Sequence, residues 1–592
     1  MRVGKLSDIP NGWQETTLDD VCQVIRGVTF PTNEKRYQPG SGLIACLRTA
    51  NVQAIVEWDN LWFIPKDYVK NENQFVAIDD VLISNANSLE LVGKVSRVTH
   101  LRYPSTLGAF ISLLRAEKGL NAAFLYYQMS TEEVQRSIRN MSSTTTNISN
   151  VSSSKLKTLP IKIAPILEQD RIVQKLEELL SDLDAGVAEL NVAKKKLASY
   201  RQALLKNAME GALTADWRIK NTPDETASAL LERILIERRV WWEAKQLAKF
   251  KEQGRKPTKD WQSKYPKPIS PALEGLPELP KEWVWVTLDM LGEIASGVAK
   301  GTKVNADVPL HEVPYLRVAN VQRGFLDLSE VKTIFATDRQ ISELTLQVGD
   351  VLFNEGGDRD KLGRGWVWND EVPSCIHQNH VFRLRPYLAE ILPELVSHHG
   401  NTFGKAWFQR AGKQTTNLAS INMTMLRHFP VPLSSAAEQK ELLAQLQYHL
   451  DALDRQEKAV VQGLKQAAVQ RKNILKNAFS GCLVIQDPMD EPATFVLERI
   501  RKARIEREKQ PKPRKAREKK ENSTMASQLI DVLAKADDWM QAQDVFELCG
   551  VSEGTLPDRI EELYAELRSL DKANRLESKR YGDYDLIRLR GE

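Results

Sequence analysis

The segment LRTANVQ, residues 47–53, returns as LRVANVQ at residues 316–322. The surrounding sequence repeats with it, and the Asp-Val-Leu run at residues 80–82 returns at residues 350–352, an offset of 270 residues. The matches cover most of residues 10–500. A unit of this length is far longer than a solenoid repeat, so it predicts duplication of a whole domain together with its connector.

Each copy has two parts of different character. The first part, residues 10–160 and 280–430, contains short runs of β-branched and aromatic residues separated by Gly, Asn and Asp, which is typical of a compact α/β domain. In the second part apolar residues recur every seven positions, which predicts a long helix with a coiled-coil seam. Such a helix of about 40 residues spans roughly 60 Å. The expected seam residues are Leu176, Leu183, Leu190, Leu197, Leu204, Leu446, Leu453, Val460, Ala467 and Ile474.

These patterns predict an α+β fold. Two α/β domains related by internal duplication are separated by long coiled-coil helices in an antiparallel pair, and a small C-terminal winged-helix-like module follows. In that module we expect three helices and a hairpin; such modules bind DNA or proteins, and both roles stay open. The expected boundaries are 8–160 for the first α/β domain, 161–217 for the first spacer helix, 218–279 for a helix and Pro/Lys-rich linker, 280–430 for the second α/β domain, 431–487 for the second spacer helix, 488–524 for a basic helix and linker, and 525–592 for the C-terminal module.

Composition indicates an intracellular protein. The net charge is only +4, so any polyanion must be met by local basic patches. The five cysteines include no CxxC pair, which argues against a disulfide scaffold and a thiolate zinc site. The group Cys375, His377 and His380 could suggest metal ligands, but the equivalent segment of the first copy has neither Cys nor His. With no signal-peptide pattern and no long uncharged apolar run, we expect a cytoplasmic protein without membrane contact or bound metal.

Motifs for catalysis are missing from the sequence. There is no NPPF- or DPPY-like tetrapeptide of adenine methyltransferases and no GxxxxGK[ST] phosphate loop. Asp224, followed by Glu243 and Lys245, superficially resembles a PD…ExK nuclease motif, but its second half falls in a strongly helical stretch. We therefore expect binding and architecture, and no catalytic residue.

The order of these elements resembles the specificity subunits of type I restriction-modification systems. Both domains begin with a Pro-x-x-Trp-type motif. Both long helices begin in a segment that contains Glu-Gln, PIKIAPILEQDRIVQKL at 160–176 and PVPLSSAAEQKELLAQL at 430–446. The two helices end in the segments LKNAMEGALT and LKNAFSGCLV. The resemblance covers roughly residues 8–500 and leaves the tail beyond residue 520 outside.

The resemblance implies a non-catalytic subunit whose two target-recognition domains each read half of a bipartite site in double-stranded DNA, with the helices fixing the gap. It also implies two methyltransferase (modification) subunits as partners, and two restriction/translocase subunits. S-adenosylmethionine, ATP and Mg belong to those partners, and this chain binds none of them. Two alternatives remain: a coiled-coil protein whose α/β domains bind other proteins, and a fused restriction-modification enzyme, which the missing motifs disfavour.

Candidate DNA-contacting residues follow from comparing the copies. Positions that are identical cannot distinguish two half-sites, so they are expected to position phosphates or to stabilise a turn: Arg48, Asn51, Gln53, Arg317, Asn320 and Gln322. The loops at 142–150 and 413–422 are expected to contact the DNA backbone or to cap the long helices; their candidates are Thr145, Asn147, Thr415 and Asn417. Polar positions that differ between copies, in the stretches 84–94 and 354–364, are expected to read bases or to form solvated loops: Asn85, Asn87, Asp358, Arg359 and Lys361.

Overall fold

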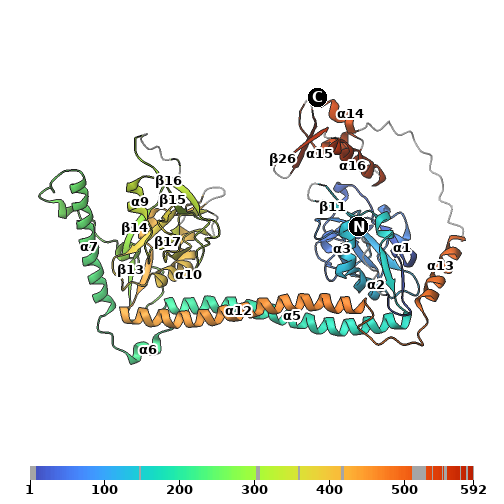
Figure 1. The fold of residues 1–592 in the computed structure, drawn as a ribbon, viewed down its shortest axis with the longest axis horizontal. Helices are drawn as coiled ribbons and strands as arrows, with labels where there is room; N and C mark the ends of the chain where they lie inside the picture. Colours follow the sequence, from blue (N-terminus) through green and yellow to red (C-terminus); the bar gives the residue numbers. More distant parts are fainter. Residues whose placement is uncertain are drawn as a thin grey trace. The chain divides into compact units, whose positions relative to one another are not determined.

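The structure, a computed structural model of the 592-residue chain, contains two compact units. One consists of residues 1–187 and 465–592, and the other of residues 188–464. Figure 1 labels their helices and strands. The structure describes residues 9–145, 148–299, 301, 307–357, 361–411, 413–414, 419–509, 529–536, 538–549, 551, 557–573, 575–581 and 584–590.

The first α/β domain is closed by pairing of its two ends. Strand β1 (Gln14–Thr17) runs antiparallel to β12 (Pro160–Ile163), so the residues that enter the domain lie beside those that leave it. The main sheet is antiparallel and has the strand order β2 (Cys22–Arg26), β9 (Ile111–Ala116), β5 (Val81–Ser84) and β7 (Val95–Arg97).

Strand β5 is buried along its whole length because both faces of the main sheet are covered. Val81 and Ile83 belong to the core that also contains residues of helices α2 (Ala122–Met129) and α3 (Glu132–Met141). Leu82, between them, belongs to a second core on the opposite face. Successive side chains of a strand point to opposite faces, so the continuous apolar run of this segment suits a strand with two packed faces.

Two smaller sheets complete the first domain, together with the short helices α1 (Leu18–Val21) and α4 (Ser153–Lys157). The first small sheet is β4 (Trp62–Pro65), β3 (Leu43–Leu47) and β8 (Ser105–Leu107), with β3 and β8 parallel. The second is β10 (Ser143–Thr145), β11 (Ile148–Asn150) and β6 (Ala86–Asn87).

The second α/β domain has the same sheets in the same order along the chain. Its ends pair as β13 (Val284–Thr287) and β24 (Pro430–Leu433). Its main sheet is β14 (Gly292–Ser296), β21 (Val381–Pro386), β17 (Val351–Asn354) and β19 (Gly365–Val367). Its small sheets are β16 (Lys332–Ala336), β15 (His311–Leu316) and β20 (Ile376–His377), and β18 (Gly356–Gly357), β23 (Ala419–Ser420) and β22 (Lys413–Gln414). Its helices are α8 (Leu288–Leu291), α9 (Asp338–Leu344), α10 (Pro393–Ala411) and α11 (Met423–Arg427).

The repeated Asp-Val-Leu run begins with a carboxylate that ties two strands of the main sheet together. Arg115 donates two hydrogen bonds to Asp80, at 2.8 and 2.7 Å, and Arg385 donates the same pair to Asp350 at the same distances. Both aspartates are buried. Bidentate pairs of this kind are strong and geometrically specific, so the run recurs for a structural reason.

The long helices contact each other in antiparallel orientation in both units. They are α5 (Ile166–Met209) and α12 (Ala436–Ala478). Arg201 pairs with Glu457 at 3.2 Å in the second unit, and Asp184 pairs with Arg471 in the first, so rising residue numbers in α5 meet falling numbers in α12. Of the predicted seam residues, Leu176, Leu204, Leu446, Leu453 and Ala467 are buried, and Leu183, Leu190, Leu197, Val460 and Ile474 are partly buried.

Helix α7 (Ala227–Glu252) packs on the second α/β domain, after the short α6 (Ala215–Lys220). The buried Arg238 of α7 donates to the Asp289 carboxylate at 2.9 Å. Part of the segment that the sequence predicts as a linker folds back on this helix, because Trp261 stacks on Trp242 with 5.8 Å between ring centroids.

Helix α13 (Ala493–Lys509) occupies the corresponding place on the first α/β domain. Its Arg507 donates to the buried Glu117 carboxylate at 2.8 and 3.0 Å, and Arg504 lies 3.5 Å from the same carboxylate. The hydrogen bonds from Arg507 hold the pKa of Glu117 below its usual value, against the opposing effect of burial.

The C-terminal segment has a core of its own, which includes Leu533, Val545, Leu563 and Ile587. Its sheet has the strand order β25, β27, β26. The elements, in chain order, are α14 (Leu529–Ala534), β25 (Met540–Gln541), α15 (Ala542–Leu548), α16 (Pro557–Lys572), β26 (Leu576–Tyr581) and β27 (Tyr584–Leu589). The fold as a whole mixes helices and sheets and contains long helices, which confirms the α+β class. Within the described residues, every helix is too short or too polar to cross a membrane.

Candidate nucleic-acid interface

The repeated LRxANVQ segment is a braced turn in both domains. In the first domain the Asn51 side chain accepts a hydrogen bond from the backbone of Arg48 at 3.0 Å and donates to the carbonyls of Glu57 and Asp59 at 2.9 and 3.1 Å. The Asn51 side chain is buried, and both the oxygen and the nitrogen of its amide group form hydrogen bonds with the backbone. This arrangement is that of a turn-stabilising residue.

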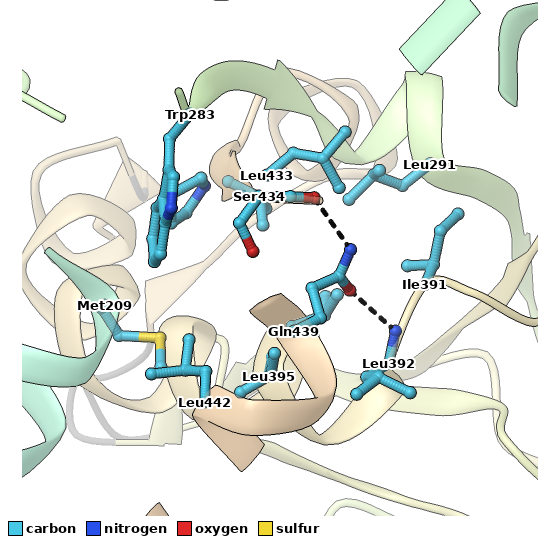
Figure 2. Close-up of a pocket in the computed structure, with 13 residues that line it drawn as sticks. Met209, Trp283, Leu291, Ile391, Leu392, Leu395, Leu433, Ser434, Gln439 and Leu442 are labelled. Carbon is cyan, nitrogen blue, oxygen red and sulfur yellow. Dashed lines mark hydrogen bonds between the residues drawn. The ribbon is translucent and has the colours of Figure 1, made fainter. Parts of the chain in front are cut away.

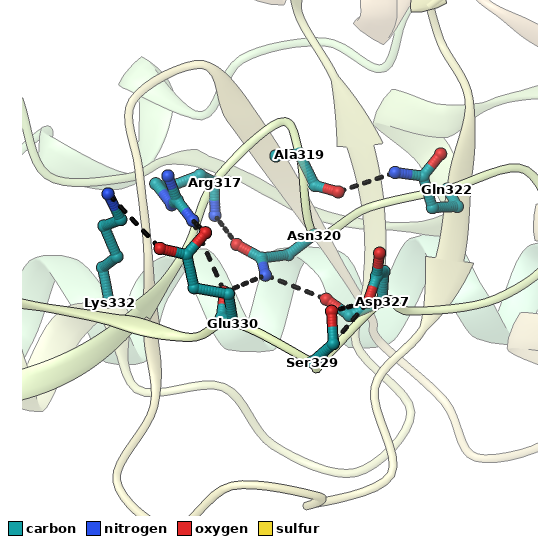
Figure 3. A network of polar contacts seen from close by, with 8 residues as sticks. All are labelled: Arg317, Ala319, Asn320, Gln322, Asp327, Ser329, Glu330 and Lys332. Atoms are coloured by element: carbon teal, nitrogen blue, oxygen red, sulfur yellow. Dashed lines mark hydrogen bonds and ion pairs between the residues drawn. The ribbon is translucent and has the colours of Figure 1, made fainter. Parts of the chain in front are cut away.

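Figure 3 shows the same network in the second domain. The Asn320 amide accepts from Arg317 N at 2.9 Å and donates to the carbonyls of Asp327 and Glu330, both at 2.9 Å. Gln322 donates to the carbonyl of Ala319 at 2.6 Å, which holds the end of the turn. These hydrogen bonds account for the recurrence of the motif without a ligand.

The arginines of the two motifs have different environments. The Arg48 guanidinium lies 4.8 Å from the centre of the Trp62 ring and donates to the carbonyl of Asn60 at 3.0 Å. The guanidinium of Arg317 instead pairs with the carboxylate of Glu330 at 3.3 Å. In the first domain Gln53 donates to the carbonyl of Ala50 at 2.9 Å and accepts from Lys94. Phosphate contact by these residues stays a prediction.

The structure brings the predicted DNA-contacting stretches together. In the first domain, Ser149 pairs with Asn87 across β11 and β6, so the loop at 142–150 and the stretch 84–94 form one small sheet. In the second domain, β18 and β23 join the corresponding stretches, with Gly356 opposite Ser420. Sequence comparison could not show this pairing, because the partners are some 60 residues apart.

The candidate residues are placed unevenly on this sheet. Asn85 is 7% exposed and its amide donates to Ser112 Oγ at 2.6 Å, which argues against direct base contact by this side chain. Asn87 is partly exposed and accepts from Ser88 N at 2.9 Å. Thr145 ends β10, and Lys361 lies after β18 in the sequence. The candidates Asn147, Asp358, Arg359, Thr415 and Asn417 lie outside the described residues.

The loop at 413–422 caps a short helix rather than a long one, since Asn422 accepts from Met425 N at 2.8 Å in α11.

The Glu-Gln pair that announces α5 locks this helix to the first domain. Glu168 is 1% exposed and accepts from the indole Nε1 of Trp13 at 3.0 Å. Gln169 accepts from Asn121 N at 2.8 Å and donates to the carbonyl of Ala164 at 2.9 Å. Burial raises the pKa of Glu168, and the hydrogen bond from Trp13 offsets this effect in part.

The equivalent pair at the start of α12 uses a different partner. Glu438 accepts from Thr214 Oγ1 and from Arg218 Nη2, both at 2.7 Å, and both members of the ion pair are largely buried. Gln439 accepts from Leu392 N and donates to the carbonyl of Ser434, both at 3.1 Å (Figure 2). The surrounding crevice is lined mainly by apolar side chains, among them Met209, Trp283, Leu291, Ile391, Leu395 and Leu442. No sequence pattern identifies Arg218 as the partner of Glu438.

The motifs that could have suggested chemistry have structural roles. Glu243 and Lys245 lie on α7 and form ion pairs with Arg239 at 3.0 Å and with Glu293 at 2.5 Å. His377 is fully buried, with its Nδ1 2.6 Å from the carbonyl of Val381, and burial lowers its pKa to about 4. In the part of the chain that the structure describes, no three Asp, Glu, His or Cys side chains gather as metal ligands would.

Comparison with known proteins agrees with this architecture. Residues 10–191 match the family described as type I restriction modification DNA specificity domain. The type I restriction enzyme EcoKI specificity subunit of Escherichia coli K12 is 25% identical over 518 residues, which cover 85% of this chain and 97% of that protein. The StySPI specificity subunit of Salmonella potsdam is 22% identical, with the same coverage. Over most of its length, this chain is similar to specificity subunits of type I restriction enzymes.

The fold also matches that of a solved type I system. A chain from a structure on the complex assembly and conformational transition of the type I R-M system superposes with a TM-score of 0.54 at 16% identity, over 80% of this chain and 99% of that chain. The relatives are specificity subunits, the non-catalytic recognition subunits of these systems, and this similarity agrees with the expectation of a chain without catalysis of its own.

Proposed function

We propose that each α/β domain is a target-recognition domain that reads one half of a bipartite, asymmetric DNA site. The observation that carries the proposal is the identical order of sheets in the two domains, combined with different side chains on the small sheets that gather the candidate loops. A duplicated scaffold with different surface residues suits two half-sites of different sequence, because bases are read by particular polar and apolar side chains.

The long helices are proposed to set the gap between the half-sites. A helix of 44 residues is about 66 Å long at 1.5 Å per residue. The buried Glu-Gln joints support this role, since they fix the first turn of each helix to its own domain. A stiff connection of this kind holds a gap constant, whereas a flexible linker would allow several gaps.

Partner subunits complete the proposed complex. We propose two methyltransferase subunits that modify adenine N6 with S-adenosylmethionine, and two restriction subunits that use ATP and Mg, all docked on this chain. The C-terminal segment is proposed to be a winged-helix-like module. Deleting residues 525–592 tests whether it serves DNA or protein contact: loss of DNA affinity by an intact complex supports the first role, and loss of a partner subunit the second.

Mapping of N6-methyladenine tests the proposal. The chain is expressed with its own methyltransferase subunit, and the methylated sites in host DNA are mapped by single-molecule sequencing. A bipartite motif with a fixed gap is expected, and exchange of the first α/β domain for that of a relative should change one half of the motif. If an intact complex methylates without such a motif, or lacks salt-dependent DNA affinity, the proposal of two target-recognition domains is wrong and a protein-binding scaffold is favoured.

A further inference from the structure

A tight turn has the same backbone hydrogen bonds in both α/β domains. It spans Gly108–Ile111 between β8 and β9, and Gln378–Val381 between β20 and β21. The N–H of the fourth residue donates to the carbonyl of the first, at 3.1 Å in one turn and 2.8 Å in the other. The N–H of the first residue donates to the carbonyl of Leu47 or of Leu316, at 2.8 and 2.9 Å.

A neighbouring chain segment holds each turn from the side. Val28 forms a parallel bridge with Gly108, and Val298 forms the equivalent bridge with Gln378. The residue before each valine is a glycine, and a Cβ there would collide with a backbone carbonyl oxygen of the turn region in both domains. The close approach therefore requires glycine, and the turn is built into a rigid framework.

The third residue of each turn connects this framework to the small sheet of candidate loops. The carbonyl of Phe110 accepts from Asn85 N, and that of His380 accepts from Glu355 N, both at 2.9 Å. The carbonyls of residues 85 and 355 in turn accept from Val151 N at 2.9 Å and from Ile421 N at 2.8 Å. Each turn thus lies beside the strands that carry the stretches predicted to contact DNA.

The side chains at this shared position differ in chemistry. Phe110 is 66% exposed, although burial of an aromatic side chain is strongly favourable. The His380 side chain is 53% exposed, and its Nδ1 lies 2.7 Å from the Glu355 carboxylate. One domain therefore presents an apolar ring and the other a polar, hydrogen-bonding pair on the same scaffold.

We infer that this position is a specificity-determining contact, one for each half-site. Phe110 contacts the 5-methyl group of a thymine, and His380, oriented by Glu355, hydrogen-bonds a base edge in the other half. Apolar contact with the thymine methyl is one of the ways in which the major groove is read, and polar side chains read the donor and acceptor pattern of the other bases. The inference deepens the proposed function and rests on it.

Methylation by the complex of the full chain with its methyltransferase subunits provides the test. The variants are F110A, H380A and, as control, Y37A, which removes another exposed aromatic side chain of the first unit (74% exposed). Single-base changes in a recognition site typically cost about 1–3 kcal/mol, so F110A should lower the preference at one position of one half-site by roughly 5- to 150-fold. H380A should relax one position of the other half, and Y37A should leave the motif unchanged.

The inference is overturned if F110A and H380A methylate the wild-type motif with undiminished selectivity at every position. If F110A abolishes methylation, its selectivity is measured instead by competition binding with DNA sites altered at single positions. An equal loss for all sites then overturns the inference, and a loss confined to one position supports it. Failure of the proposed function differs from both, since the wild-type complex itself would then lack a bipartite motif.

Discussion

The two Glu-Gln joints allow one electrostatic prediction to be developed with an internal control. Glu438 and Arg218 form a buried ion pair in which the side chains are 3% and 14% exposed. The variant E438Q leaves the Arg218 guanidinium without its counter-charge in a largely buried site. Glu168 has no such cation among its hydrogen-bond donors, which are Trp13 and Gln486. E168Q therefore keeps an acceptor for the indole and removes the cost of a buried charge.

The magnitude follows from these contacts. Removing one partner of a buried ion pair costs about 3–5 kcal/mol, and the glutamine oxygen retains one hydrogen bond, so we expect the start of α12 to lose about 2–3 kcal/mol of local stability. Hydrogen exchange at the amides of residues 434–446 should accelerate roughly 30- to 150-fold, at about 1.4 kcal/mol per factor of ten. The exchange of the amides of residues 164–176 should not accelerate in E168Q at neutral pH.

The pH dependence separates the two joints further. Burial raises the pKa of Glu168 above the unfolded value of about 4.3, so this carboxyl stabilises the folded joint at low pH, and the contribution is lost as the pH rises through the folded pKa. E168Q should therefore protect residues 164–176 better than the wild type at pH 8 and lose this advantage near pH 4. Equal acceleration in E168Q and E438Q, or none in E438Q, would refute the reasoning.

Three further predictions concern stability. Replacing Asp80 by Asn breaks the bidentate pair with Arg115 and should cost the first domain about 2–4 kcal/mol, seen as faster hydrogen exchange in β5; an unchanged rate contradicts the role of the pair. Burial lowers the pKa of His377 and of His399 to about 4. The second domain should therefore keep its full stability above the unfolded pKa of about 6.5 and lose up to about 3 kcal/mol per histidine as the pH falls toward 4. Urea-unfolding midpoints that do not change with pH would contradict this prediction. The variant E117Q removes the carboxylate that binds α13, so protease should cut that helix faster at pH 7, where the interaction is fully present, than in the wild type; equal cleavage would show that apolar packing alone holds the helix.

The internal repeat and the helical seam could be read from the sequence because both are periodic. A recurrence at a fixed offset needs no knowledge of contacts, and a seven-residue spacing of apolar side chains places them on one helix face whatever the helix packs against. The short β-branched and aromatic runs, such as that at residues 81–83, are local in the same way, and the structure places this run in a strand with two covered faces. These local patterns were sufficient for the fold class and for the resemblance to type I specificity subunits.

Which polar residues face outward was decided by the tertiary structure alone. Asn51 and Asn85 are both polar candidates for DNA contact, the first for a phosphate or a turn and the second for a base, but Asn51 braces a turn and Asn85 donates inward to Ser112. Phe110, an apolar residue that sequence reasoning would assign to a core, is held in solvent at the tip of a turn. The reason is physical: burial and hydrogen bonding depend on which distant strands pair, as the small sheet that joins residues 86–87 to 148–150 shows, and no local pattern encodes that pairing.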